Sequence, residues 1–273
     1  MPTVERDGIA IHYEVTGSGP PLLLAHSFLC SGELWAPVLP ALSARHRVVN
    51  VDARGHGASG RVPRRCAIED LLRDHLAVLD ALGIARATWA GLSLGGMVAL
   101  RAALDAPERV DALLLLDTDA GPEALAVRAR DAALAIVART IGVGPVLPRI
   151  AKLMFGTTTL RENAPLAQVW CARFARVHVP SVLNVLAAVD GRADLRPSLG
   201  RIAVPALVLV GAEDRAQPPA RSRRLATALP SARYVEVPGA GHLSALEAPT
   251  AVAEAMLGFL GDVHGGAQAG ARS

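Results

Sequence analysis

The sequence predicts an α/β fold with a mostly parallel central sheet flanked by helices, and three observations lead to this expectation. The chain has 273 residues, 51% of them hydrophobic and 19% charged, which is enough to bury a sizeable core. Short apolar runs rich in leucine or branched residues recur along it, and most are continuous, as in strands buried on both faces. Glycine-marked turns and helical patterns separate these runs, which is typical of a parallel sheet.

The strands are predicted from these runs in chain order. Residues 9–15 alternate apolar and polar side chains, which predicts a half-buried edge strand. The continuous runs predict strands buried on both faces at Leu22–Ala25, Val48–Val51, Thr88–Ala90, Ala112–Leu116, Ala206–Val210 and Arg233–Val237.

A helix is predicted between two of these strands, over Ile68–Leu82, where leucines recur at helical spacing and Gly83 supplies the stop.

From about residue 119 to residue 200 the alternation stops and no strand run is present. Helical patterns replace it, separated by glycines and prolines, at Ala124–Thr140, Leu160–His178 and Pro180–Asp190. Such an insertion between strands of a parallel sheet lies beyond their carboxyl ends, where open α/β sheets bind ligands. We therefore expect an α/β core of residues 1–118 and 201–261, and a helical lid of residues 119–200 whose inner face shapes a pocket.

The two ends of the chain lead to expectations about location and order. The first residues show no cationic segment followed by an apolar one, so we expect no secretion signal and a cytoplasmic protein. The apolar runs are of strand length, far short of the roughly 20 residues that a membrane helix needs. The tail, 262–273, is rich in glycine and alanine and is expected to be disordered, because it buries too little surface.

Charge and cysteine content disfavour several classes of protein. The formal net charge is +3, with 28 cations scattered among 25 acids, and aromatic residues make up 3% of the chain. Nucleic-acid binding needs a concentrated basic face with aromatics, so we expect no nucleic-acid partner. The apolar runs are only of strand length, so we expect no membrane partner either. The three cysteines, Cys30, Cys66 and Cys171, are too far apart for a Cys-x-x-Cys site. We expect no metal and no organic cofactor, and oligomeric state is not predicted.

A candidate nucleophile lies in the segment Gly91-Leu92-Ser93-Leu94-Gly95-Gly96, between a predicted strand that ends at Ala90 and a predicted helix over Met97–Leu104. A serine at so sharp a strand-to-helix turn takes a strained backbone, and the flanking glycines let neighbouring chain segments approach. The turn presents Ser93 at a helix N-terminus, where partial positive charge stabilises a developing anion. The alternative is a turn serine with packing glycines and no catalytic role.

A serine hydroxyl needs a base to activate it, and the base needs an orienting acid. His242 follows the last predicted strand, and Asp214 follows the strand Ala206–Val210. Both therefore emerge at carboxyl strand ends, on the same side of the sheet as Ser93. The chain order Ser, Asp, His is the one expected for this architecture.

Other residues compete for these two roles. His26 and His56 lie in glycine- or serine-rich loops near strand ends and are alternatives to His242 as the base. Asp117, at the end of the strand Ala112–Leu116, is an alternative to Asp214 as the acid. Glu213 is adjacent to Asp214 and is expected to point away from the site.

The remaining candidates are backbone donors and pocket residues. The backbone N–H of Leu94, directly after the nucleophile, and that of Phe28, in the loop after the strand Leu22–Ala25, are the candidate oxyanion donors. Ser27, Met154, Trp170 and Leu243 are candidate pocket residues. The arginines of the lid either pair with an acidic substrate or form a solvated face, and they are Arg128, Arg130, Arg149, Arg161, Arg173 and Arg176.

Over roughly residues 3–260 the chain resembles the α/β-hydrolase-fold family. The matching segments, in order, are His26-Ser27-Phe28 with Trp35 downstream, Asp52-Ala53-Arg54-Gly55-His56-Gly57-Ala58-Ser59, the turn Gly91–Met97, the loop around Asp214, and Gly241-His242. The resemblance implies the α/β-hydrolase fold, and it implies that the segment 52–59 is a structural loop bracing the site. His56 would then be structural.

Within this family, haloalkane dehalogenases and epoxide hydrolases carry an aspartate where this chain has Ser93, which argues against both activities. Cofactor-free haloperoxidases are similar too, commonly with methionine in the place of Leu94. The sequence is most similar to 3-oxoadipate enol-lactonases, in residues 52–59, in Gly91–Met97, in Ala-Pro-Glu-Arg at 106–109 and in Ser27. The predicted lid does not resemble theirs.

The sequence therefore predicts a carboxylic ester hydrolase that cleaves a small ester or lactone through an acyl-enzyme, with Ser93, His242 and Asp214 as the triad. Alternatives are a 3-oxoadipate enol-lactonase proper, or a perhydrolase or haloperoxidase in which peroxide captures the same acyl-enzyme. A further alternative is a small-molecule receptor or signalling protein on the same fold, with slow or no turnover.

Overall fold

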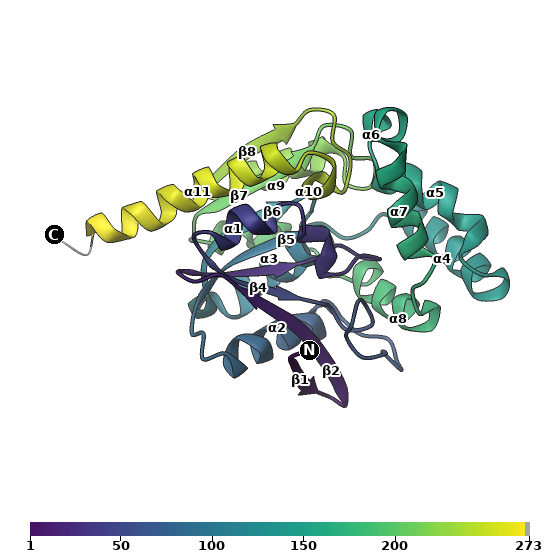
Figure 1. The fold of residues 1–273 in the computed structure, drawn as a ribbon, viewed down its shortest axis with the longest axis horizontal. Coiled ribbons are helices and arrows are strands. Elements are labelled where there is room, and N and C mark those ends of the chain that lie inside the picture. The colour runs from purple at the N-terminus through teal and green to yellow at the C-terminus, as the bar shows by residue number, and fades with distance from the viewer. Residues whose placement is uncertain (271–273) are drawn as a thin grey trace.

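The computed structural model describes residues 1–270, with side chains described up to residue 265, and its centre is an eight-stranded sheet (Figure 1). The strand order is β1-β2-β4-β3-β5-β6-β7-β8. β1 and β2 pair antiparallel with each other, and β2 pairs antiparallel with β4, whereas every other neighbouring pair is parallel. The strand bounds are β1 (Thr3–Arg6), β2 (Ile9–Thr16), β3 (Pro21–Ala25), β4 (Arg47–Val51), β5 (Ala87–Leu92), β6 (Val110–Leu116), β7 (Ala206–Gly211) and β8 (Ala232–Val237).

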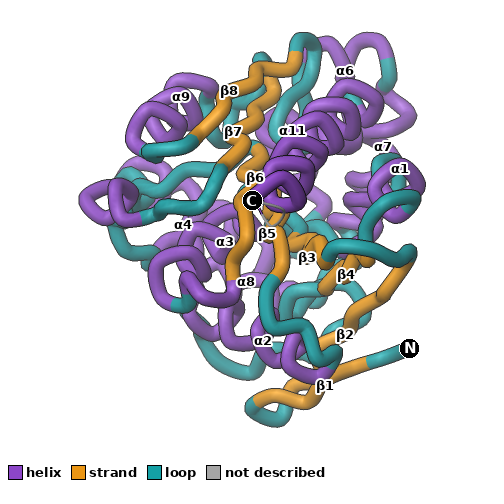
Figure 2. The backbone as a smooth tube through the Cα atoms, turned by 90° about the vertical axis from the view of Figure 1, so that its left-hand side faces the viewer, coloured by secondary structure: helices purple, strands orange, loops and turns teal. Residues whose placement is uncertain are grey.

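Helices cover both faces of this sheet (Figure 2). Their bounds are α1 (Leu39–Ser43), α2 (Ile68–Ala81), α3 (Leu94–Asp105), α4 (Leu125–Ile141), α5 (Leu147–Met154), α6 (Thr157–Glu162), α7 (Ala164–Phe174), α8 (Val179–Asp190), α9 (Pro219–Ala228), α10 (Ser244–Glu247) and α11 (Pro249–Gly270). The predicted α/β fold with a mostly parallel sheet is confirmed. None of the helices in the described part of the chain combines the length and hydropathy needed to cross a bilayer.

Two apolar clusters, one on each face, form the core. Alternate residues of β3 point to opposite faces, so that Leu23 joins one cluster while Leu22 and Leu24 join the other. Helices α2, α3 and α9 pack on the first cluster, and α1 and α11 on the second. Burial on both faces explains why the central strands read as continuous apolar runs rather than alternating ones.

The five helices α4 to α8 all lie between β6 and β7 in the sequence, within the range 119–200 that carried no strand pattern. They form a separate group at one end of the sheet (Figure 1). The predicted helix over Leu160–His178 is divided in the structure into α6 and α7. Pro165 lies in the first turn of α7, where its missing N–H is tolerated, and it would disrupt a continuous helix.

Two further expectations differ from the structure. The strand predicted at residues 9–15 is not the edge, because β1, a short strand with no apolar run, pairs along its outer side. The tail predicted as disordered, 262–273, is helical over its described part, because α11 continues to Gly270. Val263 packs against the second cluster and extends the docked part of this helix. Residues 271–273 lie outside the described residues.

Two glycines in helices provide a matched test of the close packing between α3 and β3. A Cβ added at Gly95 would lie 2.0 Å from the carbonyl oxygen of Ala25, whereas one added at Gly258 in α11 would meet nothing within 4 Å. We expect Gly95→Ala to lower the free energy of unfolding by about 1–3 kcal/mol or more, because backbone cannot yield as a side chain can. Gly258→Ala should raise it by roughly 0.5–1 kcal/mol through helix propensity. Urea denaturation measures both, and equal stabilities for the two variants would contradict this account of the packing.

Candidate active site

Ser93 occupies the turn between β5 and α3 with a backbone that L-residues rarely adopt, φ 54° and ψ −109°. The turn is possible only because glycines flank it: a Cβ at Gly91 would lie 2.1 Å from the carbonyl carbon of Gly95. Two hydrogen bonds fix it to the neighbouring strand, from the Ser93 N–H to the Leu116 carbonyl (2.9 Å) and from Thr118 Oγ1 to the Ser93 carbonyl (2.8 Å). The strain predicted from the sequence is present, and it directs the Ser93 side chain into a cavity.

His242 lines this cavity, and its ring is hydrogen-bonded to Asp214. The Nδ1 atom of His242 lies 2.8 Å from Asp214 Oδ2, and both residues are buried. The other carboxylate oxygen of Asp214 accepts hydrogen bonds from the N–H groups of Ala216 and Gln217, at 2.8 Å each. These bonds fix the carboxylate so that it receives the Nδ1 proton and leaves Nε2 as the free nitrogen of the ring.

Burial alone would lower the pKa of His242, but the charge of Asp214 and its hydrogen bond outweigh that effect, and the net result is a raised pKa. Ser93 and His242 line the same cavity. Among the described residues no hydrogen bond joins Ser93 to His242. The hydrogen bond between a catalytic nucleophile and its base is often long or poorly aligned in the absence of substrate, and it tightens when substrate binds.

Asp117, the alternative acid, has other partners. Its Oδ1 accepts a hydrogen bond from the Gly211 N–H (2.8 Å), and its Oδ2 lies 2.5 Å from Ser244 Oγ. Complete burial and the nearby charge of Asp214 raise its pKa well above the usual range, so the neutral carboxyl is favoured. The structure thus places Asp214, and not Asp117, against the His242 ring, while Asp117 connects the loops that carry these two residues.

The alternative bases are bound on both ring nitrogens by backbone. His26 Nδ1 lies 2.7 Å from the Ser27 carbonyl, and its Nε2 accepts from the Ala53 N–H at 2.9 Å. His56 contacts the Arg54 carbonyl through Nδ1 (3.2 Å) and accepts from the Leu29 N–H through Nε2 (3.3 Å). Burial lowers the pKa of His56 to about 3, so its ring is neutral. Both histidines brace the loops around the site.

Glu213 points away from His242, as expected. Its carboxylate accepts hydrogen bonds from the N–H (2.8 Å) and the Oγ1 hydroxyl (2.6 Å) of Thr158, in α6. The residue therefore connects the loop after β7 to the helical insertion. Gln217, whose N–H helps to fix Asp214, was not identified from the sequence, because a backbone donor leaves no signal in residue type.

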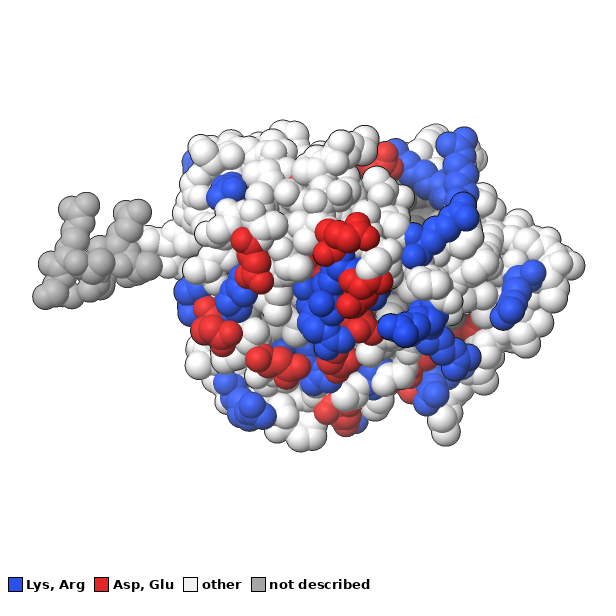
Figure 3. Space-filling view, turned by 90° about the horizontal axis from the view of Figure 1, so that it is seen from below, with Lys and Arg blue, Asp and Glu red and all other residues white. Residues whose placement is uncertain are grey.

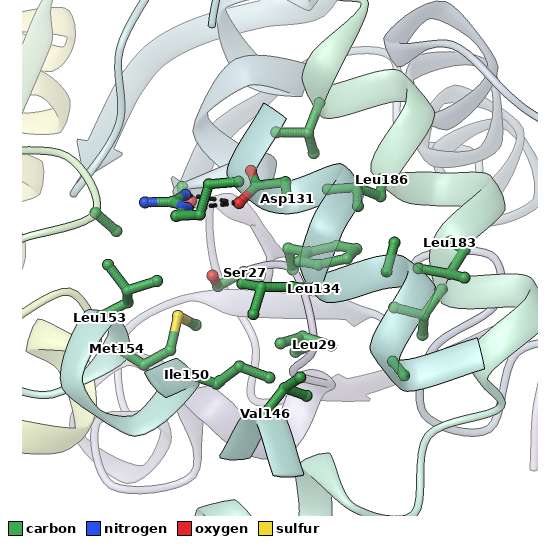
Figure 4. Close-up of a pocket in the computed structure, with 18 of the residues that line it drawn as sticks. Ser27, Leu29, Asp131, Leu134, Val146, Ile150, Leu153, Met154, Leu183 and Leu186 are labelled. Atoms are coloured by element: carbon green, nitrogen blue, oxygen red, sulfur yellow. Dashed lines mark hydrogen bonds and ion pairs between the residues drawn. The ribbon is translucent and has the colours of Figure 1, made fainter. Parts of the chain in front are cut away.

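The two predicted backbone donors lie at the same end of the sheet. Leu94 begins α3 and Phe28 lies in the loop after β3, and neither amide donates a hydrogen bond to another residue of the described chain. Beside Phe28, the Oγ of Ser27 is buried without a hydrogen-bond partner among the described residues, and Ser27 lines the cavity (Figure 4). These three hydrogen-bond donors therefore have no partner among the described residues.

The cavity that contains Ser93 and His242 has a volume of about 180 Å³ and a mostly apolar wall. Figure 4 shows its labelled aliphatic side chains around Ser27 and Leu29. The insertion supplies most of this wall, from α4, α5 and α8, and the aliphatic residues include Val127, Leu134, Val146, Ile150, Leu153, Val182, Leu183 and Leu186. The helices between β6 and β7 thus line the same cavity as Ser93, which follows β5, and His242, which follows β8.

The charged groups in the cavity wall are paired. Glu123 lies 3.0 Å from the guanidinium of Arg192, with both side chains buried, and Asp131 lies 2.7 Å from Arg130. Figure 4 shows the Asp131 pair at one side of the cavity. Asp131 has its counterion within the wall, and Glu123 has its counterion, Arg192, outside it. Because both carboxylates are paired, the cavity offers a bound group mainly apolar contact.

The predicted pocket residues divide into two sets. Ser27 and Met154 line the cavity, as expected. Leu243 does not: its side chain is completely buried in the second core cluster, and its N–H donates to the Met154 carbonyl (3.2 Å). Trp170 lines a different, neighbouring pocket. The position of Leu243 in the sequence, directly after His242, did not show whether its side chain lines the cavity or packs in the core, because a leucine in this loop could do either.

The side chains that the structure describes contain no group of three His, Cys, Asp or Glu residues placed to bind a metal ion. Cys30 lies near the site but is not a reactive thiol, because burial strongly raises its pKa.

The chain belongs to the alpha/beta hydrolase family, whose model matches residues 22–255. It is similar to an esterase from Thermogutta terrifontis, with a TM-score of 0.90 and 28% identity over 96% of this chain and 97% of the other. It is also similar to the enol-lactonase from Burkholderia xenovorans LB400, with a TM-score of 0.88 and 32% identity over 95% and 99% of the two chains. A pimeloyl-[acyl-carrier protein] methyl ester esterase of Nitrosomonas europaea is 31% identical over 88% of this chain and 95% of its own.

Paired substitutions distinguish the two buried aspartates. Asp214→Asn should lower kcat by about ten-thousandfold, because an amide at this position favours the wrong tautomer of His242. Asp117→Asn should keep kcat within about tenfold of the wild type, since an amide resembles the neutral carboxyl that burial favours at this position. Steady-state ester hydrolysis measures both, and a larger loss in Asp117→Asn than in Asp214→Asn would reverse the assignment.

The pH profile tests His242. A general base must be neutral, so kcat/KM should rise with pH through the pKa of His242 and then reach a plateau. Because that pKa is raised from 6.5, the midpoint should lie above 6.5. A midpoint below this value, or a flat profile from about pH 5 to pH 8, would argue against His242 as the base.

Proposed function

We propose that the protein is a serine hydrolase that cleaves a small carboxylic ester or lactone through an acyl-enzyme. The observation that carries the proposal is that Asp214 orients His242 at 2.8 Å, while His242 and the strained Ser93 face one cavity. Membership of the alpha/beta hydrolase family supports it, as does similarity to proteins named as esterases and an enol-lactonase.

In the proposed mechanism, Ser93 Oγ attacks the carbonyl carbon of the substrate while His242 Nε2 accepts its proton. The carbonyl oxygen becomes an oxyanion and accepts hydrogen bonds from the Phe28 and Leu94 amides. The imidazolium, stabilised by Asp214, then protonates the leaving alcohol as the carbon–oxygen bond breaks. Water attacks the resulting acyl-serine with His242 again as base, which releases the acid and restores Ser93.

The cavity wall indicates which part of the substrate it accommodates. Its aliphatic lining and its internally paired charges favour an uncharged hydrocarbon group, because an unpaired carboxylate there would lose its hydration without gaining a counterion. A volume of about 180 Å³ limits that group to a short or medium chain. We therefore propose an ester or lactone with an apolar group on one side of the carbonyl.

A lactone substrate is the second candidate, and similarity to the enol-lactonase from Burkholderia xenovorans LB400 favours it. Lactone and ester hydrolysis share every step above, and they differ only in whether the leaving alcohol stays attached to the acyl group. Peroxide in place of water would give perhydrolysis from the same acyl-enzyme.

Hydrolysis of p-nitrophenyl esters of increasing acyl length, together with a panel of small lactones, tests the proposal. The wild type should turn over, and Ser93→Ala should lose about a thousandfold or more of kcat. Ser222→Ala is the matched control, because it removes the same atom from a buried serine that hydrogen-bonds the Thr118 carbonyl outside the cavity.

Two outcomes would contradict the proposal. Turnover that survives in Ser93→Ala would place the chemistry elsewhere. An absence of turnover on every ester and lactone, together with tight ligand binding, would instead favour a receptor on this fold.

A further inference from the structure

A second pocket of about 350 Å³ lies beside the active-site cavity. It is built from the loop after β3, the loop after β4 and the segment that joins α7 to α8. The two spaces share Leu29 and Val177 as part of their walls. Leu29 directly follows Phe28, the candidate oxyanion donor, so the second pocket begins next to the position proposed for the scissile carbonyl.

This second pocket is positively charged, and we call it the basic pocket. Its wall contains three guanidinium groups, Arg61, Arg173 and Arg176, and a single carboxylate, Glu33. His56 is also in the wall but is neutral, because burial lowers its pKa to about 3. The wall therefore carries an excess of two positive charges without any contribution from its histidines.

The three arginines differ in what restrains them. Arg173 lies 3.1 Å from Glu33 and stacks over the Trp170 ring, with 4.6 Å between guanidinium carbon and ring centroid. Among the described residues, no acidic side chain pairs with Arg61 or with Arg176. These two guanidinium groups differ from that of Arg130 in the wall of the active-site cavity, which has Asp131 as its carboxylate partner.

The surface charge agrees with this local excess. On the face shown in Figure 3, acidic and basic side chains alternate over the left and central part of the molecule, whereas basic side chains predominate toward the right, the side of the helical insertion. An excess of basic side chains on this side of the molecule favours the approach of an anion to the insertion.

We propose that the basic pocket binds an anionic group of the substrate, a carboxylate or a phosphate, while the apolar part of the same molecule occupies the active-site cavity. The proposal rests on the hydrolase function proposed above and names its substrate class: an amphipathic ester with one uncharged and one anionic end. Arg61 and Arg176 are the specificity residues, because guanidinium groups bind carboxylate and phosphate in bidentate geometry. The geometry also explains how an acidic substrate can use a site whose cavity is apolar.

The test compares matched substrates. The butanoate ester of 4-hydroxybenzoate carries a carboxylate on the leaving group, that of 4-hydroxyphenyl phosphate carries a phosphate, and that of 4-hydroxybenzamide is neutral. A second pair, the mono-p-nitrophenyl ester of adipate and p-nitrophenyl hexanoate, places the charge on the acyl side instead. The measured quantity is the ratio of kcat/KM for the anionic ester to that for its neutral partner.

We expect the wild type to prefer at least one anionic ester, and the double variant Arg61→Ala/Arg176→Ala to lower the ratio by about tenfold, mainly through KM, which corresponds to about 1.4 kcal/mol. The leaving-group esters distinguish carboxylate from phosphate as the natural group. Arg161→Ala is the matched control, because Arg161 is exposed, pairs with Glu162 and lines neither pocket. A ratio that is unchanged in the double variant for all anionic esters would overturn the proposal.

A binding experiment separates failure of this proposal from failure of the hydrolase function. If no ester is turned over, the hydrolase function fails, and the basic pocket is then tested by calorimetric titration of Ser93→Ala with 4-hydroxybenzoate and with 4-hydroxyphenyl phosphate. Binding that is lost in Ser93→Ala/Arg61→Ala/Arg176→Ala supports the anion site. Binding that is equal in the two variants, or undetectable in both, overturns it.

Discussion

The turn at Ser93 is the constraint on which the rest of the site depends. Its φ of 54° can be maintained only if β5, α3 and β3 approach until no Cβ fits between them, which is why glycine stands at positions 91 and 95. Close approach in turn requires continuous apolar strands with helices on both faces. The strained residue is thus stabilised by the whole core, and the strain points Ser93 at the carboxyl ends of the strands.

The acid–base pair depends on a second layer of buried polar contacts. Asp214 is fixed by two backbone amides and by His242, while Asp117 connects Gly211 to Ser244 and so joins the loops that follow β7 and β8. Two aspartates so close together cannot both be charged at low cost, and burial assigns the neutral form to Asp117. One carboxyl therefore acts as a structural connection, and the other is the hydrogen-bond partner of His242.

In the proposed function, the helical insertion gives the site its selectivity without contributing to the chemistry. The same group of helices presents aliphatic side chains to the active-site cavity and arginines to the basic pocket, and Leu29 and Val177 stand between them. Under the proposed function, the groups that react and the groups that recognise the substrate lie on different elements. The sheet positions Ser93, and the inserted helices determine which molecules reach it.

The sequence by itself determined the fold and the candidate reacting groups, because both depend on local patterns: continuous apolar runs, glycines around Ser93, and polar residues directly after strands. Only the tertiary structure shows that Asp214, and not Asp117, contacts His242, that backbone groups occupy both ring nitrogens of His26 and His56, and that Leu243 packs in the core while Trp170 lines a neighbouring pocket. Each of these choices depends on contacts between residues far apart in the chain. The division of one predicted helix into α6 and α7, and the basic pocket formed between two core loops and the insertion, arise in the same way, since no single segment contains the residues that make them.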